Sequence, residues 1–457
     1  MFTFSQKHTK LTSLYLYSGK SDELSPKLRK HARGKRPVLV IPTLATEFTL
    51  PEHRPVFLNI LKQLSRVKYL YKIIFGVDAA TDDETVELAR LIKSYGIKNY
   101  IIQHNNGKGF TSLYEQLGEA GFRHTHPGKG KNMFMSFGVA HALGSQCIGV
   151  IDADIRTFHR KQLDRLFYPV LVLEYEFSKA FYSRIGDTQM YGRVKRLLLD
   201  PLLIALKRKF SETGEDKFLR IIDYLLAFNY QLSGEVVFDT SLLKRMHFAT
   251  NWGVEIFTLI EVYRKATSVA QVQFSSKAFD HKHQPVSEND SDKGLYKMAM
   301  DIVTTIISTL VVEEGLEISD YFVQDLTATY INVADELIKK YSDNSQFCDL
   351  HYDRNAEEAI VHGVFKDAIL TAGDYLTSPY RITERFLRIL LSDKRFQKYL
   401  DEGLSIDLLN YESENQSQLF EIPQTVSWER IIVKLPGILD DISSVVKKEM
   451  ALYAKLD

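Results

Sequence analysis

The sequence predicts an α/β fold with a Rossmann-like, mainly parallel sheet covered by helices on both faces. Short runs of continuous apolar residues recur along the first part of the chain, and amphipathic stretches alternate with them. This alternation is typical of a parallel sheet buried on both sides. Polar residues follow directly after several of the apolar runs. Because ligands of such sheets bind beyond the carboxyl ends of the strands, these polar residues form the candidate site.

The first four strands are expected at 38–41, 72–77, 100–102 and 147–151, where Val and Ile are frequent. Helices are expected between them at 55–67, 82–95 and 132–142. Asp82 and Asp83 favour a helix start because acidic residues in the first turn interact favourably with the helix dipole. Later strands are expected at 178–182, 235–238 and 270–274, within a region that mixes strands and helices.

After an acidic, polar stretch at 288–292, helical periodicity dominates the chain. Helices are expected at 295–312, 318–340, 356–370, 382–391 and 428–456. We therefore divide the chain into an N-terminal arm (1–36), an α/β domain (37–287) and a helical C-terminal region (288–457). The sequence assigns no role to this last region.

The amino-acid composition argues against several classes of protein. The 457 residues contain 58 Lys+Arg and 58 Asp+Glu, so the formal net charge is zero. This balance argues against a nucleic-acid partner, which would favour an excess of positive charge. Cys147 and Cys348 are the only cysteines, too few for a disulfide framework. We see no apolar signal segment and no run near the roughly 20 apolar residues that a membrane span needs. A cytoplasmic protein without a membrane span is expected.

The segment Asp152-Ala153-Asp154 directly follows a predicted strand. Residues two apart on an extended segment point to the same side, so both carboxylates can face one ion. Such oxygen ligands suit Mg²⁺ or Mn²⁺, which share their coordination with substrate phosphates. His281 follows the predicted strand 270–274, and an imidazole beside carboxylates favours Mn²⁺. The alternative for Asp152-Ala153-Asp154 is a solvated loop, and the alternative for the His281 segment is a hydrogen-bonded loop.

A glycine-rich, basic segment at 127–132 opens a predicted helix and contains Lys129. Glycines allow the backbone to approach a phosphate, and a helix N-terminus attracts an anion. The spacing is not that of a Walker A loop, and a flexible basic loop is the alternative. Glu235 and Glu255 each lie in a turn that contains glycine, before a strand or a helix. For Glu255, a helix-capping role is the alternative.

Taken in order, these segments resemble the retaining GT-A glycosyltransferases of the glucosyl-3-phosphoglycerate synthase group and their mannosylglycerate synthase-type relatives. The resemblance covers about 38–287. It rests on Pro42-Thr43-Leu44, Asp78 to Thr85, Gly128-Lys129-Gly130, Asp152-Ala153-Asp154, Lys179 to Arg184, Gly192-Arg193, Gly234-Glu235, Gly253-Val254-Glu255 and His281.

The resemblance implies a GT-A catalytic domain and a role for each matched residue. Nucleotide-sugar binding is implied for Pro42, Thr43, Leu44, Asp78, Lys129, Asp152 and Ala153. Metal binding is implied for Asp152, Asp154 and His281. Acceptor binding is implied for Arg193, Lys195 and Glu235. Catalytic roles are implied for Glu255 and Asp152. Lys195 stands where the family commonly has a threonine, which leaves the exact acceptor open.

The implied reaction moves glucose or mannose, with retention of configuration, to a small anionic acceptor such as 3-phosphoglycerate or glycerate. UDP-glucose, GDP-glucose and GDP-mannose are the donors considered, Mg²⁺ or Mn²⁺ is the expected metal, and the product class is a compatible solute of the glucosylglycerate type. A homodimer is left open. One alternative is a sugar-nucleotide pyrophosphorylase, although the first loop lacks a Gly-rich triphosphate-binding run. Another is a sugar-nucleotide-binding or scaffold protein without catalysis.

Overall fold

A computed structural model describes residues 6, 8–16, 23–122, 128–186, 188–277, 279–281, 294–377 and 425–454. Within these ranges, eight strands form one sheet with the order β1-β8-β6-β7-β5-β2-β3-β4. The strands are β1 (Leu11–Leu14), β2 (Val38–Leu44), β3 (Lys72–Asp78), β4 (Tyr100–His104), β5 (Cys147–Val150), β6 (Phe177–Phe181), β7 (Val236–Asp239) and β8 (Val269–Gln273). Only β7 runs antiparallel to its neighbours, β5 and β6. The predicted mainly parallel sheet is confirmed.

All seven predicted strands are present, with ends displaced by up to three residues. β2 continues through Pro42, Thr43 and Leu44, where we expected the strand to end. β5 pairs only with residues 38–40 of β2, so Pro42 has a strand neighbour on one side only. A residue without an N–H is tolerated at such a position. β1 was not predicted: it lies in the expected N-terminal arm and pairs in parallel with β8.

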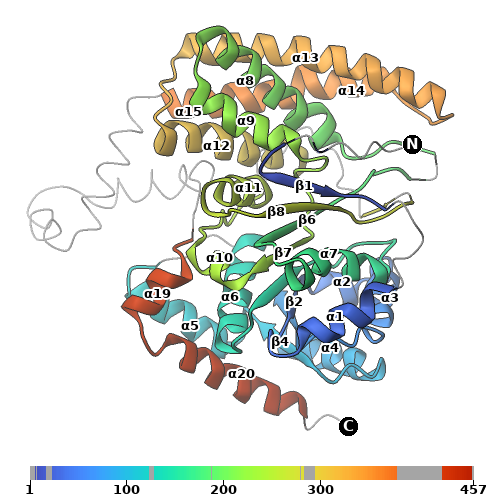
Figure 1. Cartoon of the computed structure of the whole chain (residues 1–457), viewed down its shortest axis with the longest axis vertical. Coiled ribbons are helices and arrows are strands. Elements are labelled where there is room, and N and C mark those ends of the chain that lie inside the picture. Colours follow the sequence, from blue (N-terminus) through green and yellow to red (C-terminus); the bar gives the residue numbers. More distant parts are fainter. Residues whose placement is uncertain are drawn as a thin grey trace, which may run out of the picture.

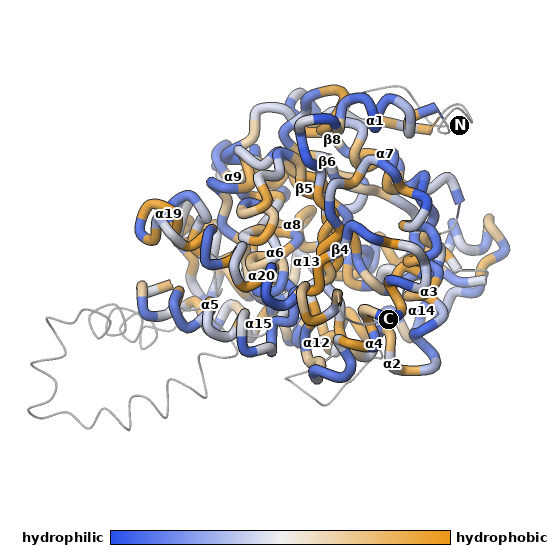
Figure 2. The backbone as a smooth tube through the Cα atoms, turned by 90° about the horizontal axis from the view of Figure 1, so that it is seen from below, coloured by the Kyte–Doolittle hydropathy of each residue, from blue (hydrophilic) through white to orange (hydrophobic). Residues whose placement is uncertain are grey.

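Helices cover both faces of the sheet (Figure 1). Along β2, Val38 and Val40 belong to one apolar core, whereas Leu39 and Ile41 belong to the other. Figure 2 shows that hydrophobic residues are concentrated along the central strands. The helices of this part are α1 (Leu24–Ala32), α2 (Thr46–Thr49), α3 (Arg54–Leu64), α4 (Asp82–Ser94), α5 (Lys108–Glu119), α6 (Lys129–Ala142), α7 (Arg160–Val172), the π-helix η2 (Val194–Leu199), α8 (Asp200–Thr213), α9 (Asp216–Ala227), α10 (Thr240–Arg245) and α11 (Val254–Lys265).

The C-terminal helices lie at two ends of the sheet (Figure 1). Helices α12 to α15 lie with α8 and α9 beyond β1, whereas α20 contacts α5, α6 and β4 at the other end. Their bounds are α12 (Gly294–Glu314), α13 (Asp320–Phe347), α14 (Arg354–Ile360), the π-helix η3 (Val361–Phe365), α15 (Lys366–Thr377), α19 (Trp428–Lys434) and α20 (Ile438–Ala454). The predicted helix at 382–391 and the predicted boundary at 288–292 lie outside the described residues, so the division into three parts stays a prediction.

Two helices of this region differ from a simple expectation. A single helix at 428–456 was wrong: α19 and α20 are separate, because Pro436 and Gly437 interrupt the helix. The stretch Gly294–Val311 of α12 is long and apolar enough to cross a membrane, but 72% of it is buried inside the protein. It packs against α11 and α15, as the core helix of a soluble protein does.

Candidate active site

The residues predicted to bind the nucleotide sugar and the metal meet at one edge of the sheet. β2, β3 and β4 are parallel, so their carboxyl ends lie together, with Leu44 of β2 paired to Asp78 of β3. β5 is parallel to β2 and leads directly to Asp152. Three of the residues predicted to bind the nucleotide sugar have no free polar side chain for it. The Thr43 hydroxyl donates to the Ile41 carbonyl at 2.9 Å, Ala153 is buried, and Leu44 is about half exposed but apolar.

Asp78 is fixed by two amide side chains from the neighbouring elements. Asn105 Nδ2 donates to Asp78 Oδ1 at 2.8 Å, and Asn132 Nδ2 donates to Asp78 Oδ2 at 2.7 Å. Burial raises the pKa of Asp78, although both hydrogen bonds oppose this effect. The carboxylate therefore joins the ends of β3 and β4 to helix α6.

Helix α6 begins at Lys129, three residues earlier than expected. A Cβ atom at Gly128 would lie 2.6 Å from the Thr250 carbonyl oxygen, and one at Gly130 would lie 2.1 Å from that of Ala249. Both glycines are therefore required by the close approach of another backbone segment, in addition to any role beside a phosphate. Residues 123–127 lie outside the described residues.

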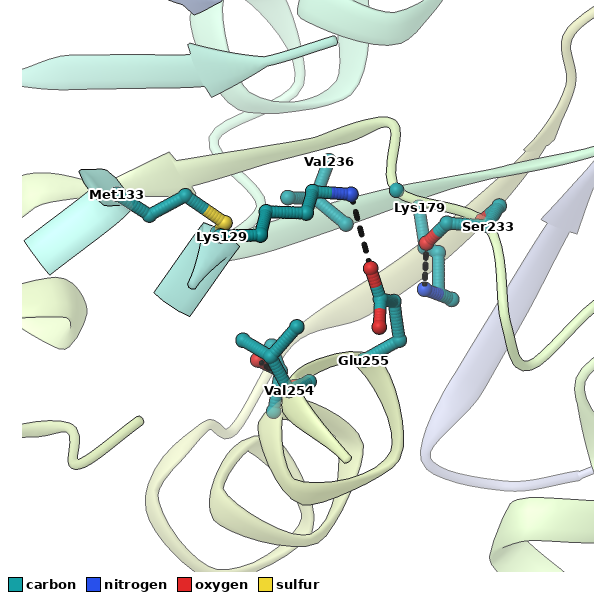
Figure 3. Close-up of a pocket in the computed structure, with 9 residues that line it drawn as sticks. Lys129, Met133, Lys179, Ser233, Val236, Val254 and Glu255 are labelled. Atoms are coloured by element: carbon teal, nitrogen blue, oxygen red, sulfur yellow. Dashed lines mark hydrogen bonds and ion pairs between the residues drawn. The ribbon is translucent and has the colours of Figure 1, made fainter. Parts of the chain in front are cut away.

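Lys129 is held between two carboxylates. Its Nζ lies 2.5 Å from Asp152 Oδ1. It also lies 2.9 Å from Glu255 Oε1, an ion pair that Figure 3 marks with a dashed line. Burial alone would lower the pKa of Lys129, but these two acids raise it above its usual value. A Cβ atom at Gly234 would lie 2.4 Å from Asp152 Oδ2 and 2.5 Å from the Lys129 Nζ. Gly234 is therefore the residue that leaves room for the ion pair.

A cluster of possible metal ligands lies beside this ion pair. One ligand atom each from Asp152, Glu235 and His281 lies within 4.8 Å of the others. His281 Nδ1 lies 3.3 Å from Asp154 Oδ1, and His281 Nε2 lies 3.7 Å from Glu235 Oε1. The structure thus brings the three predicted metal residues together and adds Glu235, which we had placed on the acceptor side. Glu235 is fully buried, so its position fits a cation better than a soluble acceptor.

The cluster has the chemistry of a divalent cation site. Glu235 Oε1 and His281 Nε2 are buried atoms without a hydrogen-bond partner among the described residues. Burial raises the pKa of Glu235. Burial also opposes charge on His281 and Asp154, yet their hydrogen bond raises the pKa of the histidine and lowers that of the aspartate. Carboxylate oxygens with one imidazole suit Mg²⁺ or Mn²⁺, so the residues present fit the predicted metal.

Two charged residues near the site were quoted in the sequence motifs but not predicted as site residues. Lys179 is almost fully buried in β6, donates to the Ser233 carbonyl at 2.6 Å, and has its pKa lowered to about 8 by burial. The pKa of Arg184 is raised: burial opposes the charge, but Tyr230, Tyr182 and Asp154 outweigh it. Lysine and arginine are seldom buried unless paired. The position of Lys179 within an apolar strand was therefore the sequence signal that could have marked it as a site residue.

The two other predicted acceptor residues lie on a separate segment, with Arg193 directly before η2 and Lys195 within it. Lys195 Nζ lies 2.5 Å from Asp200 Oδ2, so its charge is already balanced within the chain. It lines a cavity of about 280 Å³ that also contacts Tyr341 of α13. Arg193 is half-buried, and burial lowers its pKa, while Glu357 of α14 opposes this effect. The acceptor roles of Arg193 and Lys195 stay predictions.

No family model matches the chain. The glucosyl-3-phosphoglycerate synthase of Persephonella marina is 34% identical over 368 residues, which are 79% of this chain and 87% of that relative. The enzyme of the same name from Methanococcoides burtonii is 30% identical over 340 residues, 74% of this chain and 81% of that relative. A crystal structure of the Mycobacterium tuberculosis enzyme with Mn²⁺, UDP and glucosyl-3-phosphoglycerate has a TM-score of 0.47 and 22% identity, over 65% of this chain and 87% of that one. On the identity and coverage of the first two relatives, the chain belongs to the glucosyl-3-phosphoglycerate synthase family and is a glycosyltransferase of GT-A fold.

Proposed function

We propose that the chain transfers glucose from a nucleoside diphosphate glucose to 3-phosphoglycerate with the help of Mg²⁺ or Mn²⁺. The observation that carries this proposal is the cluster of Asp152, Glu235 and His281 beside the Lys129–Asp152 ion pair. Its position at the carboxyl ends of the parallel strands is that of a nucleotide site. The names of the two relatives above support glucose as the sugar and 3-phosphoglycerate as the acceptor.

Each residue then has a chemical task. Asp152, Asp154, His281 and Glu235 would hold the cation, which neutralises charge on the departing diphosphate. Lys129 lies in the first turn of α6, where an ammonium group and a helix N-terminus both favour a phosphate. Arg193 would bind the phosphate or carboxylate of the acceptor bidentately. Glu255 is the residue that we expect to orient the acceptor or the sugar.

Donor and acceptor can be tested together. UDP-glucose, GDP-glucose and GDP-mannose would each be incubated with 3-phosphoglycerate or glycerate, in the presence of Mn²⁺, Mg²⁺ or a chelator. UDP-glucose is the first choice, because the M. tuberculosis relative has been crystallised with it and phosphoglyceric acid. We expect a glucosylated phosphoglycerate only when metal is present, with the anomeric configuration of the donor retained in its NMR spectrum. Absence of transfer with every pair would contradict the proposal.

The two alternatives would both give no transfer with these pairs, so a further incubation with a sugar 1-phosphate and a nucleoside triphosphate is needed to separate them. A pyrophosphorylase would form a nucleotide sugar from a sugar 1-phosphate and a nucleoside triphosphate, and a scaffold protein would bind a donor without turnover. We also expect a cytoplasmic location. A homodimer stays a prediction that light scattering of the purified chain would test.

A further inference from the structure

The segment that carries Arg193 is supported by the helical region. Residues 184–186 pair with residues 189–191 as in a tight hairpin, in which Tyr191 N–H donates to the Arg184 carbonyl at 2.8 Å. On its outer side, Gln189 forms a parallel bridge with His351, and His351 N–H donates to the Thr188 carbonyl at 2.7 Å. His351 lies just before α14, so the hairpin is extended by a strand-like partner from the C-terminal region.

A second contact comes from α14 itself. Arg196 Nη1 lies 2.9 Å from Glu357 Oε2, and Arg196 Nη2 lies 2.6 Å from Glu357 Oε1. Both side chains are nearly buried, with 8% and 11% exposed. The same guanidinium donates from Nε to the Tyr191 carbonyl at 3.0 Å and from Nη2 to the Met190 carbonyl at 3.3 Å. One arginine therefore ties a carboxylate of the helical region to the backbone just before Gly192-Arg193.

We propose that Glu357 is a positioning residue for the acceptor: it fixes Arg196, and Arg196 fixes the backbone that presents Arg193. The inference rests on the proposed function, in which Arg193 binds the anionic acceptor. A bidentate pair of charged groups sets geometry as well as energy. Gly192 has a φ of +80°, a conformation that glycine adopts readily, so the neighbouring backbone needs such external support to stay in one place. A preorganised site binds more tightly because less ordering is left for the ligand to induce.

The chain offers a matched control for this contact. Glu314 of α12 accepts from Arg264 Nη2 at 2.6 Å and from Arg264 Nε at 3.1 Å, and it also pairs with Lys217 Nζ at 2.9 Å. Like Glu357, it therefore joins the helical region to the α/β part. Its side chain is 14% exposed, close to the value for Glu357. Arg264 lies nine residues after Glu255 on α11, about 13 Å further along the helix. Breaking this pair should change the same kind of contact without reaching the acceptor segment.

The kinetic experiment compares wild type, Glu357→Gln and Glu314→Gln. We expect both variants to lower the thermal midpoint by similar amounts. Only Glu357→Gln should raise the KM for 3-phosphoglycerate, by about tenfold, with the donor KM changed less than about twofold. In an Arg196→Lys background, Glu357→Gln should add little further effect, because the two residues act as one unit. Equal acceptor KM values for the two glutamate variants would overturn the proposal.

Hydrogen exchange gives a readout that does not depend on turnover. Amide exchange at 184–193 should be faster in Glu357→Gln and unchanged in Glu314→Gln. Unchanged exchange in Glu357→Gln would show that the carboxylate does not hold the segment. If the wild type does not glucosylate 3-phosphoglycerate, the proposed function fails, and exchange alone still decides whether Glu357 positions the segment. If Glu357→Gln does not fold, Glu357→Asp replaces it, with an intermediate rise in exchange and KM expected.

Discussion

The proposed donor side and the proposed acceptor side of the site are built in different ways. On the donor side, Asp78, Asn105 and Asn132 lie at the ends of β3 and β4 and in the first turn of α6, within 54 residues of one another. On the acceptor side, the Arg193 segment is held by Glu357 through Arg196, 161 residues earlier in the chain. Strand ends and helix α6 place the donor side, whereas a contact with α14 supports the acceptor side. Changes at Glu357 of α14 should therefore alter acceptor binding without altering donor binding.

The largest effect on activity is expected at the cluster of candidate metal ligands. His281→Ala removes one member of the metal cluster, so kcat should fall by roughly 10²-fold or more, because charge on the leaving diphosphate loses its stabilisation. A chelator should abolish wild-type activity, and Mn²⁺ should restore it. His31→Ala, on the exposed surface of α1, is the control and should behave as wild type. Full activity of His281→Ala, or of the wild type in chelator, would contradict the assigned cluster.

Gly234→Ala tests the space around the ion pair. The added methyl group would meet the ends of the Asp152 and Lys129 side chains and no backbone atom among the three nearest atoms, so we expect the fold to be kept. We expect kcat/KM to fall about 10- to 100-fold with little change in the thermal midpoint. Gly363→Ala is the control, since a Cβ atom there would meet nothing within 4 Å. Unchanged activity of Gly234→Ala would show that the ion pair need not keep its place.

Asp78→Asn is the donor-side counterpart of Glu357→Gln. An amide cannot accept from both Asn105 and Asn132 with the strength of a carboxylate, so the ends of β3, β4 and α6 should separate slightly. The KM for the donor should rise about tenfold, with the acceptor KM nearly unchanged. Asp83→Asn, exposed in the same stretch, is the control. If both KM values rose together, the two sides would not be separable.

The smallest effect concerns a contact between the C-terminal helix α20 and the donor side. Helix α20 lies along β4, where Ile102 N–H donates to Met450 Sδ at 3.5 Å. Next to it, burial raises the pKa of Glu449 to about 7, from an unfolded value of 4.5. The folded state therefore binds more protons between these two pH values, and the contribution of Glu449 to stability falls as pH rises from about 4.5 to 7.

Glu449→Gln removes this titration. The thermal midpoint of the wild type minus that of Glu449→Gln should be larger at pH 5 than at pH 8. This difference should be constant above about pH 8. A difference that does not change with pH would show that Glu449 has an ordinary pKa. Donor KM measured over the same range would show whether α20 supports the donor side or only the sheet edge.

Much of this arrangement could be predicted from the sequence. Apolar runs such as 38–41 and 147–151 marked the strands, because strands buried on both faces need continuous apolar side chains. The polar residues that follow them had to meet at one edge, because the carboxyl ends of parallel strands lie together. Asp152, Asp154 and His281 were predicted as neighbours and are neighbours in the structure. The short strand β1 and the break at Pro436 escaped prediction because each involves only a few residues.

The sequence by itself thus determined seven of the eight described strands and the edge where the candidate metal ligands meet, because strand periodicity and strand-end chemistry are local properties of the chain. Only the tertiary structure decided that Glu235 faces His281, that Gly234 leaves room for Lys129, and that Glu357 reaches Arg196. These contacts depend on how separate elements pack, and neither residue of such a pair carries a signal that names its partner. The Arg193 segment depends most on such contacts, so its support by α14 could not be predicted from the sequence.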